Sequence, residues 1–517
     1  MLGRMSFWLT TLLVTAGLVA GKMLMHISAH TEDLDTGNYS NYAWGILHGQ
    51  GFYGSVLGRH HLGEHFSPIM ALVAPLYLLR PTAHHLMILQ GLAVAIGVLL
   101  TLVFSSRRLE EACFDERFIG PRAVTVKAGA AGLLLLLMML YPPLLATWNT
   151  QFQPIELGLP MVVGAMMLLH AAPTRRNALL LWLLVFLLLS TRESAPLSVL
   201  GLAIYAASLR RARLALALGV VAGVWAAIAM GIVMPWFRGG EAWGHIRWLG
   251  LSGSTDSEAF MWERKAFYLA ALVGGMGLLP LMGRRALWAT AAALPGVLLN
   301  LSVKNRVPQV AFQAHYDAQI SGFLIVAAAL GAAWLAQRLF PVPQHAGSPT
   351  PRHRPWAAVA FVTGMVAISF ATFQISKVRS VPERFSDWWP THAQQRLINQ
   401  SKEFARKYSD APSLAAHGWI GPHVAHRPDY RSMRVTDKER WPGWVRDRVD
   451  PGMIFIVPGE RYAPEDSPRA ILRASGRALL LEQTPWVEVY RWPGEAPPRG
   501  TDAAEQYARE GLERAAK

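Results

Sequence analysis

The chain has 517 residues, of which 52% are hydrophobic and only 16% are charged. A soluble chain of this length is normally about one quarter charged, so this composition excludes a purely soluble enzyme, a disordered protein and a collagen-like chain. Its single cysteine, Cys113, excludes an intramolecular disulfide framework and a cysteine-rich metal site. These exclusions leave a membrane protein.

Long apolar runs predict eleven membrane-spanning helices, because a span needs about 20 mostly apolar residues and fewer where neighbours protect it. They are expected at residues 5–25, 84–104, 123–141, 156–172, 177–190, 195–209, 214–235, 266–282, 286–301, 318–338 and 356–375. Residues 5–20 also resemble a signal-peptide core, but the apolar run continues to Met25 without a small-residue cleavage site, which favours a retained helix. The shorter run at 69–79 predicts a re-entrant or interfacial helix.

The basic residues support this count and give an orientation. With a cytoplasmic N-terminus, the inward connections carry more arginine than the outward loops, as in the pairs Arg107–Arg108, Arg175–Arg176 and Arg284–Arg285. The net charge of +15 is therefore explained as a topology signal, and no nucleic-acid motif points to that partner. We expect a multi-pass protein of a bacterial inner membrane, in contact with membrane lipids.

The fold class predicted from these patterns is an all-α polytopic membrane protein with a small C-terminal α/β domain. We expect a transmembrane core at 1–340 with a long first outer loop at 28–83, a cytoplasmic linker at 341–355, a last span at 356–375 and a periplasmic domain at 376–517. Within that domain, helices are predicted at 391–408 and 467–475 and strands at 453–457 and 478–491.

Two carboxylates, Asp33 and Asp35, follow the first predicted span. Carboxylates two residues apart can share a divalent cation, Mg²⁺ or Mn²⁺, or one can act as a base while the other tunes it. The alternative is that they cap the helix expected from Asn38 to His48.

Further along the first outer loop, His61, Glu64 and His65 match H-x-x-E-H, the inverted zinc-protease pattern. That pattern needs a helix, which Gly63 inside the motif and Pro68 after it disfavour. A looser metal or phosphate role for Glu64 and His65 ranks above a protease, and a hydrogen-bonded loop histidine ranks above both.

Other unusual polar residues are predicted at the same outer edge of the bilayer, where they become functional candidates because polar groups at membrane depth are costly. They are Glu156, Arg192, Glu193, Lys304, Arg306, His315 and Tyr316. Arg192 can bind a phosphate through its guanidinium fork, or pair internally with Glu193. The residues from 304 to 316 can add donors for an anion, or contact headgroups in an aromatic belt. Glu156 is a further candidate metal ligand beside Asp33, Asp35 and Glu64.

Several of these stretches resemble the domain-of-unknown-function 2079 family of predicted polytopic membrane proteins. The matching segments are Asp35–Trp44, His48–Tyr53, Leu62–Pro68, Phe152–Glu156, Arg192–Ala195 and His315–Tyr316. Family members more often have Asp-Leu-Gly in the first motif, Phe-His-Pro in the fourth of these segments and an Asp after the acidic residue in the fifth. This chain has Thr36, Gln153 and Ser194 there, so no role passes from the family's histidine to position 153.

That family in turn looks like the GT-C superfamily of membrane glycosyltransferases. The resemblance implies a GT-C-like helical core and a polyprenyl phosphate-linked sugar donor used on the outer face, with an unidentified acceptor. Such a transfer needs a base for the acceptor hydroxyl and cationic help for the departing phosphate. The candidate base is Asp35, with Asp33 as second choice or metal partner; the candidates for the substrate and its phosphate are Glu64, His65, Arg192, Lys304, Arg306, His315 and Tyr316.

Two other classes of function remain open from the sequence. A transporter or flippase of a lipid-linked or anionic substrate would carry charges near the middle of its spans and broken helices in repeated halves, and neither pattern is evident. A non-enzymatic envelope assembly protein would use the outer domain to bind a partner, and the polar residues at the outer edge would then share no purpose.

Overall fold

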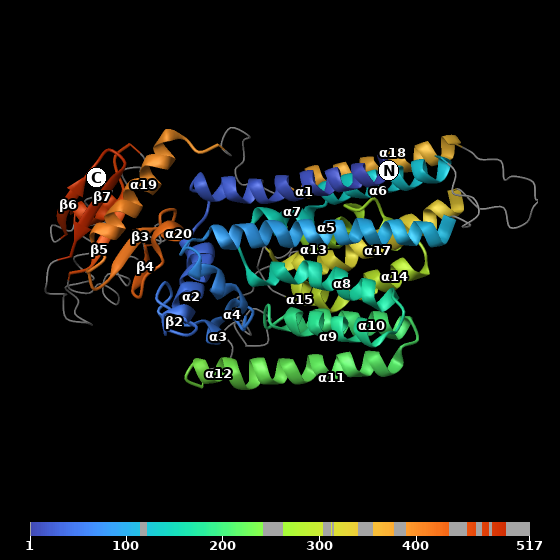
Figure 1. Ribbon diagram of the computed structural model, residues 1–517, viewed down its shortest axis with the longest axis horizontal. Helices are drawn as coiled ribbons and strands as arrows, with labels where there is room; N and C mark the ends of the chain where they lie inside the picture. The colour runs from blue at the N-terminus through green and yellow to red at the C-terminus, as the bar shows by residue number, and fades with distance from the viewer. Residues whose placement is uncertain are drawn as a thin grey trace, which may run out of the picture. The chain divides into compact units, whose positions relative to one another are not determined.

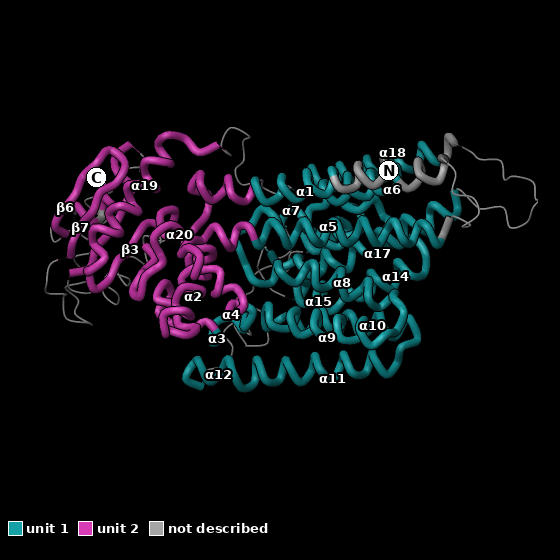
Figure 2. Tube along the Cα trace, in the orientation of Figure 1, with its two compact units in different colours: residues 1–20, 62–69, 89–380 teal, residues 21–61, 70–88, 381–517 magenta. Residues whose placement is uncertain are grey.

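The computed structural model describes residues 2–113, 121–240, 262–302, 312, 315–339, 355–376, 389–433, 452–461, 468–474 and 478–492. The chain divides into two compact units (Figure 2). Unit 1 consists of residues 1–20, 62–69 and 89–380, and unit 2 of residues 21–61, 70–88 and 381–517. The first outer loop and the first and fifth helices therefore contribute to both units.

Unit 1 is helical. It contains parts of two helices, α1 (Leu2–Ile27) and α5 (His84–Cys113). Its other helices are α6 (Pro121–Met139), α7 (Pro142–Asn149), α8 (Gly158–His170), α9 (Arg175–Leu189), α10 (Ala195–Ser208), α11 (Ala212–Ile228), α12 (Met234–Phe237), α13 (Trp262–Gly274), α14 (Arg284–Ala291), α15 (Leu294–Ser302), α17 (Ala318–Leu339) and α18 (Pro355–Ser376). Helix α17 is buried along most of its length and packs against α8 and α14 (Figure 1). Gly331 permits close packing of α17 against the 3-10 turn η6 (Leu279–Leu281), because an added Cβ would overlap the carbonyl oxygen of Leu279.

Helical structure lies within all eleven ranges predicted as spans, although fewer of these helices can cross a bilayer unaided. Among the described residues, five are long and apolar enough: Leu9–Ile27, His84–Glu111, Ala212–Phe237, His315–Leu339 and Ala358–Ser376. A bent pair, Ala128–Met139 and Pro142–Asn149, gives a sixth; its two parts meet at 59°, where Pro142 begins the second helix. The range 286–301 is divided between α14 and α15. The helical membrane core is confirmed, whereas the number of eleven spans stays a prediction.

Unit 2 contains a five-stranded sheet in the order β4-β3-β5-β7-β6 (Figure 1). The strands are β3 (Leu414–His417), β4 (Tyr430–Met433), β5 (Ile454–Pro458), β6 (Leu479–Gln483) and β7 (Val487–Arg491). β4, β3 and β5 are parallel, while β5, β7 and β6 are antiparallel. Every residue of the central strand β5 is buried, which explains its unbroken apolar sequence. Helices α19 (His392–Lys407), α20 (Gly421–Val424) and α22 (Pro468–Ala474) complete the domain and, with the strands at the predicted ranges, confirm its α/β character.

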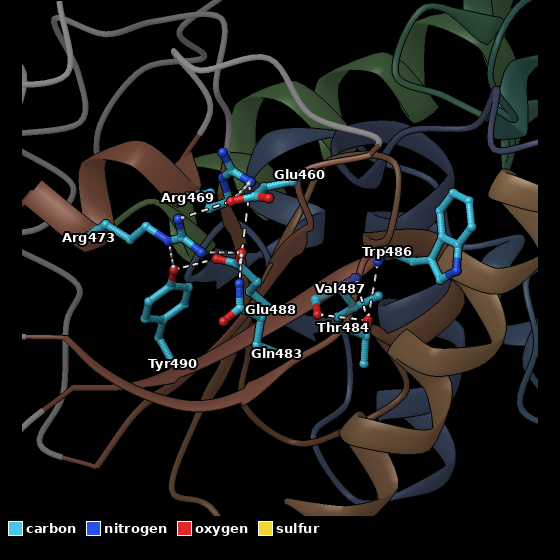
Figure 3. Close-up of polar contacts among 9 residues, drawn as sticks. All are labelled: Glu460, Arg469, Arg473, Gln483, Thr484, Trp486, Val487, Glu488 and Tyr490. Atoms are coloured by element: carbon cyan, nitrogen blue, oxygen red, sulfur yellow. Dashed lines mark hydrogen bonds and ion pairs between the residues drawn. The ribbon is translucent and has the colours of Figure 1, made fainter. Parts of the chain in front are cut away.

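A buried ion-pair network ties α22 to the sheet (Figure 3). Glu488 on β7 is fully buried, accepts a hydrogen bond from Arg473 Nη2 at 2.6 Å and lies 3.8 Å from Arg469 Nη1. Tyr490 Oη donates to the same carboxylate and accepts from Arg473 Nε at 2.9 Å. Because each oxygen of the buried carboxylate has a donor, this network serves the fold of the domain.

The first outer loop supplies short elements to unit 2: η1 (Asp33–Gly37), α2 (Asn38–Leu47), β1 (Tyr53–Gly54), β2 (Arg59–His60), α4 (Met70–Val73) and η2 (Ala74–Leu78). The last two follow each other directly and lie within the range 69–79, where a re-entrant or interfacial helix is predicted. Asn41 Nδ2 donates to the carbonyl of Ala425 at 2.8 Å, and Val56 lies in the same core as Leu414 and Ile456. The loop therefore folds together with the C-terminal sheet. The predicted linker at 341–355 lies outside the described residues except for Pro355, which begins α18.

Candidate functional site

In unit 1, the turn between α9 and α10 brings together four of the polar residues singled out above. Arg192 Nη1 donates to His315 Nε2 at 2.6 Å, and Arg192 Nη2 lies 3.5 Å from His65 Nδ1. His65 Nδ1 also lies 3.0 Å from Glu193 Oε1, which Arg192 Nε contacts at 3.5 Å. Arg192, Glu193 and His315 are all less than 9% exposed. Because a guanidinium only donates, His315 accepts through Nε2 and carries its hydrogen on Nδ1.

Glu193 connects this cluster to the first outer loop. Its second carboxylate oxygen, Oε2, accepts the backbone N–H of Phe66 at 3.1 Å. Burial alone would raise the pKa of Glu193, but the His65 contact and the Arg192 charge outweigh it and hold the pKa below its usual value. The carboxylate is therefore ionised and balances the buried guanidinium.

Two groups of hydrogen bonds hold the cluster in place. Gln319 at the start of α17 donates to Thr191 Oγ1 at 2.9 Å and accepts from Ser198 Oγ at 2.6 Å, so the turn that carries Arg192 is fixed from both sides. Asp317 accepts from Tyr268 Oη at 2.5 Å and from Asn300 Nδ2 at 3.1 Å. Because Asp317 belongs to the same short 3-10 turn as His315, this second network positions the histidine.

Other predicted members of the site join this cluster only in part. The Arg192 guanidinium lies 5.7 Å from the ring centroid of Tyr316, a cation–π distance. Glu64 is half-buried, and it ends the four-residue helix α3 (His61–Glu64) directly before His65. Lys304 and Arg306 lie outside the described residues. The cluster that the structure describes can hold an anionic group beside a guanidinium and two imidazoles.

The two aspartates of the first loop lie in unit 2. Both belong to the π-helical turn Asp33–Gly37, and the residue before α2 is Gly37, which makes no side-chain cap hydrogen bond. Neither aspartate is therefore the N-cap residue of α2. Asp33 is 1% exposed and accepts from Tyr430 Oη at 3.3 Å, whereas Asp35 is half-buried. Burial first, and then the charge of Asp33, raise the pKa of Tyr430 above its usual value, so the tyrosine stays a neutral donor.

Of the four carboxylates proposed as metal ligands, Asp33 and Asp35 lie in unit 2, and Glu64 and Glu156 lie in unit 1. Glu156 is fully buried and accepts from the backbone N–H of Gln153 at 3.2 Å and from Thr150 Oγ1 at 3.1 Å, in a capping box that begins the 3-10 turn Pro154–Leu157. Across the described ranges, no group of three or more histidine, cysteine or acidic side chains is arranged to hold a metal ion. The divalent cation stays a prediction.

The H-x-x-E-H motif lies only partly on a helix. Helix α3 ends at Glu64, so the helix that the motif needs stops before its second histidine. His61 packs against the rings of Tyr39 and Tyr42, with centroids 5.2 and 4.3 Å away, while His65 contacts Glu193.

Sequence reasoning missed some of the residues that shape these clusters. It treated Glu193 as the ion-pair partner of Arg192, whereas Glu193 also binds His65 and the Phe66 backbone. It gave no role to Tyr430, or to Gly421, where an added Cβ would overlap Asp33. Pairs so far apart in the chain leave no signal in a single sequence.

Comparison with known families places the chain. The family described as "Predicted membrane protein (DUF2079)" matches residues 25–448. The chain belongs to this family. This DUF2079 protein matches no curated protein in a sequence comparison.

Two solved structures share the fold of this DUF2079 protein. The apo structure of ArnT from Cupriavidus metallidurans has a TM-score of 0.50 at 14% identity and covers 94% of this chain and 98% of its own. The structure of the same protein bound to undecaprenyl phosphate has a TM-score of 0.51 at 13% identity and covers 96% of this chain and 99% of its own. The likeness extends over nearly the whole of both chains and shows a shared fold.

Proposed function

We propose that this protein is a GT-C-like glycosyltransferase of the bacterial inner membrane, which transfers a sugar from a polyprenyl phosphate-linked donor to an acceptor on the outer face. The fold likeness to ArnT, which has been crystallised with undecaprenyl phosphate, supports a polyprenyl phosphate ligand. The observation that carries the proposal is the contact of Arg192 with His315 and His65 in the turn between α9 and α10. A bidentate donor beside two imidazoles suits a phosphate oxyanion.

In the proposed reaction the acceptor hydroxyl attacks the anomeric carbon of the donor sugar. The new bond forms between the acceptor oxygen and that carbon, the bond from the carbon to the phosphate oxygen breaks, and polyprenyl phosphate leaves with the electron pair. The hydroxyl proton passes to a carboxylate base, for which Asp35 is the candidate. Arg192, with His65 and His315, stabilises the negative charge that develops on the departing phosphate.

The phosphate role is tested by binding two lipids to detergent-purified full-length protein, undecaprenyl phosphate and the uncharged undecaprenol, with native mass spectrometry. Arg192→Gln should weaken undecaprenyl phosphate binding by about tenfold or more, since a hydrogen bond to a charged group contributes about 1.5–3 kcal/mol. It should leave undecaprenol binding unchanged. Arg264→Gln is the matched control, because Arg264 is an exposed arginine in α13. Equal binding of undecaprenyl phosphate to the wild type and a folded Arg192→Gln protein would refute the phosphate site.

The base is tested by identifying the lipids that co-purify with the protein in mild detergent. Asp35→Asn should retain a polyprenyl phosphate sugar that the wild type turns over, and its mass would identify the donor. Sugar transfer by a folded Asp35→Asn protein at the wild-type rate would remove Asp35 from the mechanism.

A further inference from the structure

A cavity of about 460 Å³ lies at the end of unit 1 where α5 and α17 terminate and α14 begins. Its lining includes Arg108 and Glu111 from α5, Arg284 and Arg285 from α14, and Trp334 and Gln337 from α17. His315 precedes the other end of α17, and 22 helical residues at 1.5 Å each put about 30 Å between the two sites. The cavity is therefore separate from the Arg192 cluster.

The cavity is positively charged. Its lining includes three guanidinium groups and one carboxylate, and Glu111 already accepts from Arg108 Nη2 at 2.6 Å. The Nε of Arg108 is buried, and no residue that the structure describes offers it a hydrogen-bond acceptor, which is costly for a charged donor. Arg284 and Arg285 are exposed. An anion in the cavity would supply acceptors that these guanidinium groups can use.

The surroundings of the cavity are apolar. Large exposed hydrophobic side chains stand on the elements that form its wall, namely Leu281, Leu287, Trp288 and Trp334, each between 38% and 48% exposed. Trp334 packs closely on Gly283, where an added Cβ would come within 2.7 Å of the indole ring. A ligand that combines an anionic head with apolar chains matches both the charge of the cavity and this rim.

We propose that this cavity binds the phosphodiester headgroup of an anionic phospholipid from the bilayer leaflet at this end of the helices, with its acyl chains against the exposed leucines and tryptophans. Basic pockets between transmembrane helices recognise such headgroups by the same chemistry. The simpler explanation is that Arg284 and Arg285 only orient the protein in the membrane. It predicts that substituting this pair changes phospholipid binding no more than substituting another arginine pair.

A matched pair of variants separates the two explanations. Arg175 and Arg176 begin α9 as Arg284 and Arg285 begin α14, and both pairs are exposed, but only the second lines the cavity. Full-length protein in detergent is titrated with dioleoylphosphatidylglycerol, with zwitterionic dioleoylphosphatidylcholine and with water-soluble glycerol phosphate, and binding is measured by native mass spectrometry.

The wild type should bind phosphatidylglycerol more tightly than phosphatidylcholine. Arg284→Gln/Arg285→Gln should weaken phosphatidylglycerol binding by about thirtyfold, because each basic residue near a lipid headgroup contributes about a factor of five. Arg175→Gln/Arg176→Gln should bind as the wild type does. An equal loss in both double variants, or equal affinity for the two lipids, would overturn the proposal. Glycerol phosphate that binds as tightly as phosphatidylglycerol would show that a free phosphate compound is the ligand and would overturn the lipid assignment.

Discussion

Unit 2 should lose stability as the pH falls below about 6.5, because it buries histidines that are neutral when folded. His426 Nε2 lies 2.6 Å from Ser40 Oγ, and the His423 ring stacks on His26 with centroids 4.2 Å apart. The His423 side chain is buried. Burial, and then the charges of Lys402 and neighbouring histidines, lower the pKa of His426 to about 3 and the pKa of His423 well below its usual value.

The size of the effect follows from the difference in bound protons. A histidine in the unfolded chain takes up a proton near pH 6.5, whereas folded His426 stays neutral until about pH 3. Between these values the unfolded state binds one proton more, so each such histidine costs the folded state about 1.4 kcal/mol per pH unit. From pH 7 to pH 5, His426 alone should cost about 2 kcal/mol, or about a thirtyfold change in the unfolding equilibrium.

Hydrogen exchange of the full-length protein, followed by mass spectrometry, measures this stability locally. Protection factors of peptides from β3, β5 and α20, corrected for the intrinsic pH dependence of exchange, should fall by about thirtyfold or more from pH 7 to pH 5. His426→Gln should remove about 2 kcal/mol of that dependence, while His392→Gln should keep it, because the exposed His392 ring stays hydrated on folding. A wild-type pH dependence in a folded His426→Gln protein would refute this reasoning.

Two further predictions concern packing and charge. Gly421→Ala should destabilise unit 2 by about 1–3 kcal/mol in the same hydrogen-exchange measurement, because the added Cβ would overlap Asp33. Gly418→Ala should cost less, because its Cβ would lie 3.6 Å from the Asp33 carboxylate. Equal destabilisation by the two variants would contradict the packing argument. Glu193→Gln should lower the stability of unit 1 by about 3 kcal/mol in thermal unfolding, because it leaves a buried guanidinium without its counter-charge. Glu111→Gln should cost less than about 1 kcal/mol, because the Glu111 carboxylate that pairs with Arg108 is 57% exposed. A comparable loss of stability in Glu193→Gln and Glu111→Gln would show that burial does not determine the cost of breaking these ion pairs.

The elements that the sequence predicts well are those whose pattern reflects their own burial. The run Ile454–Val457 is wholly apolar because β5 is buried between two strands and under helices, and α19 shows the spacing of a helix with one buried face. The strand β3, with the sequence Leu-Ala-Ala-His, carries no such signal and becomes a strand because β4 and β5 pair with it on either side. The local sequence pattern thus predicts elements such as β5 and α19, whereas a strand such as β3 depends on the strands that pair with it.

The same distinction applies to the candidate site. Adjacent residues such as Arg192 and Glu193 suggest an ion pair from the sequence, and the structure contains it at 3.5 Å. The closer contact of Glu193 is with His65, 128 residues earlier, and Asp33 meets Tyr430 across 397 residues. Such long-range pairs depend on how the helices pack, which composition and spacing do not encode.

The role of the first outer loop is better tested with point variants than with a deletion. Residues 62–69 of this loop belong to unit 1 and supply His65 to the Arg192 cluster, while residues 21–61 and 70–88 belong to unit 2. The unit 2 part supplies Ser40 and Asn41, which bond His426 and the carbonyl of Ala425. A deletion would therefore remove contacts from both units at once and lose activity whatever the mechanism. Arg192→Gln changes a contact within unit 1, so a loss of phosphate binding in this variant can be assigned to Arg192. Asp35→Asn changes a residue of unit 2, so retention of a donor lipid in this variant can be assigned to Asp35.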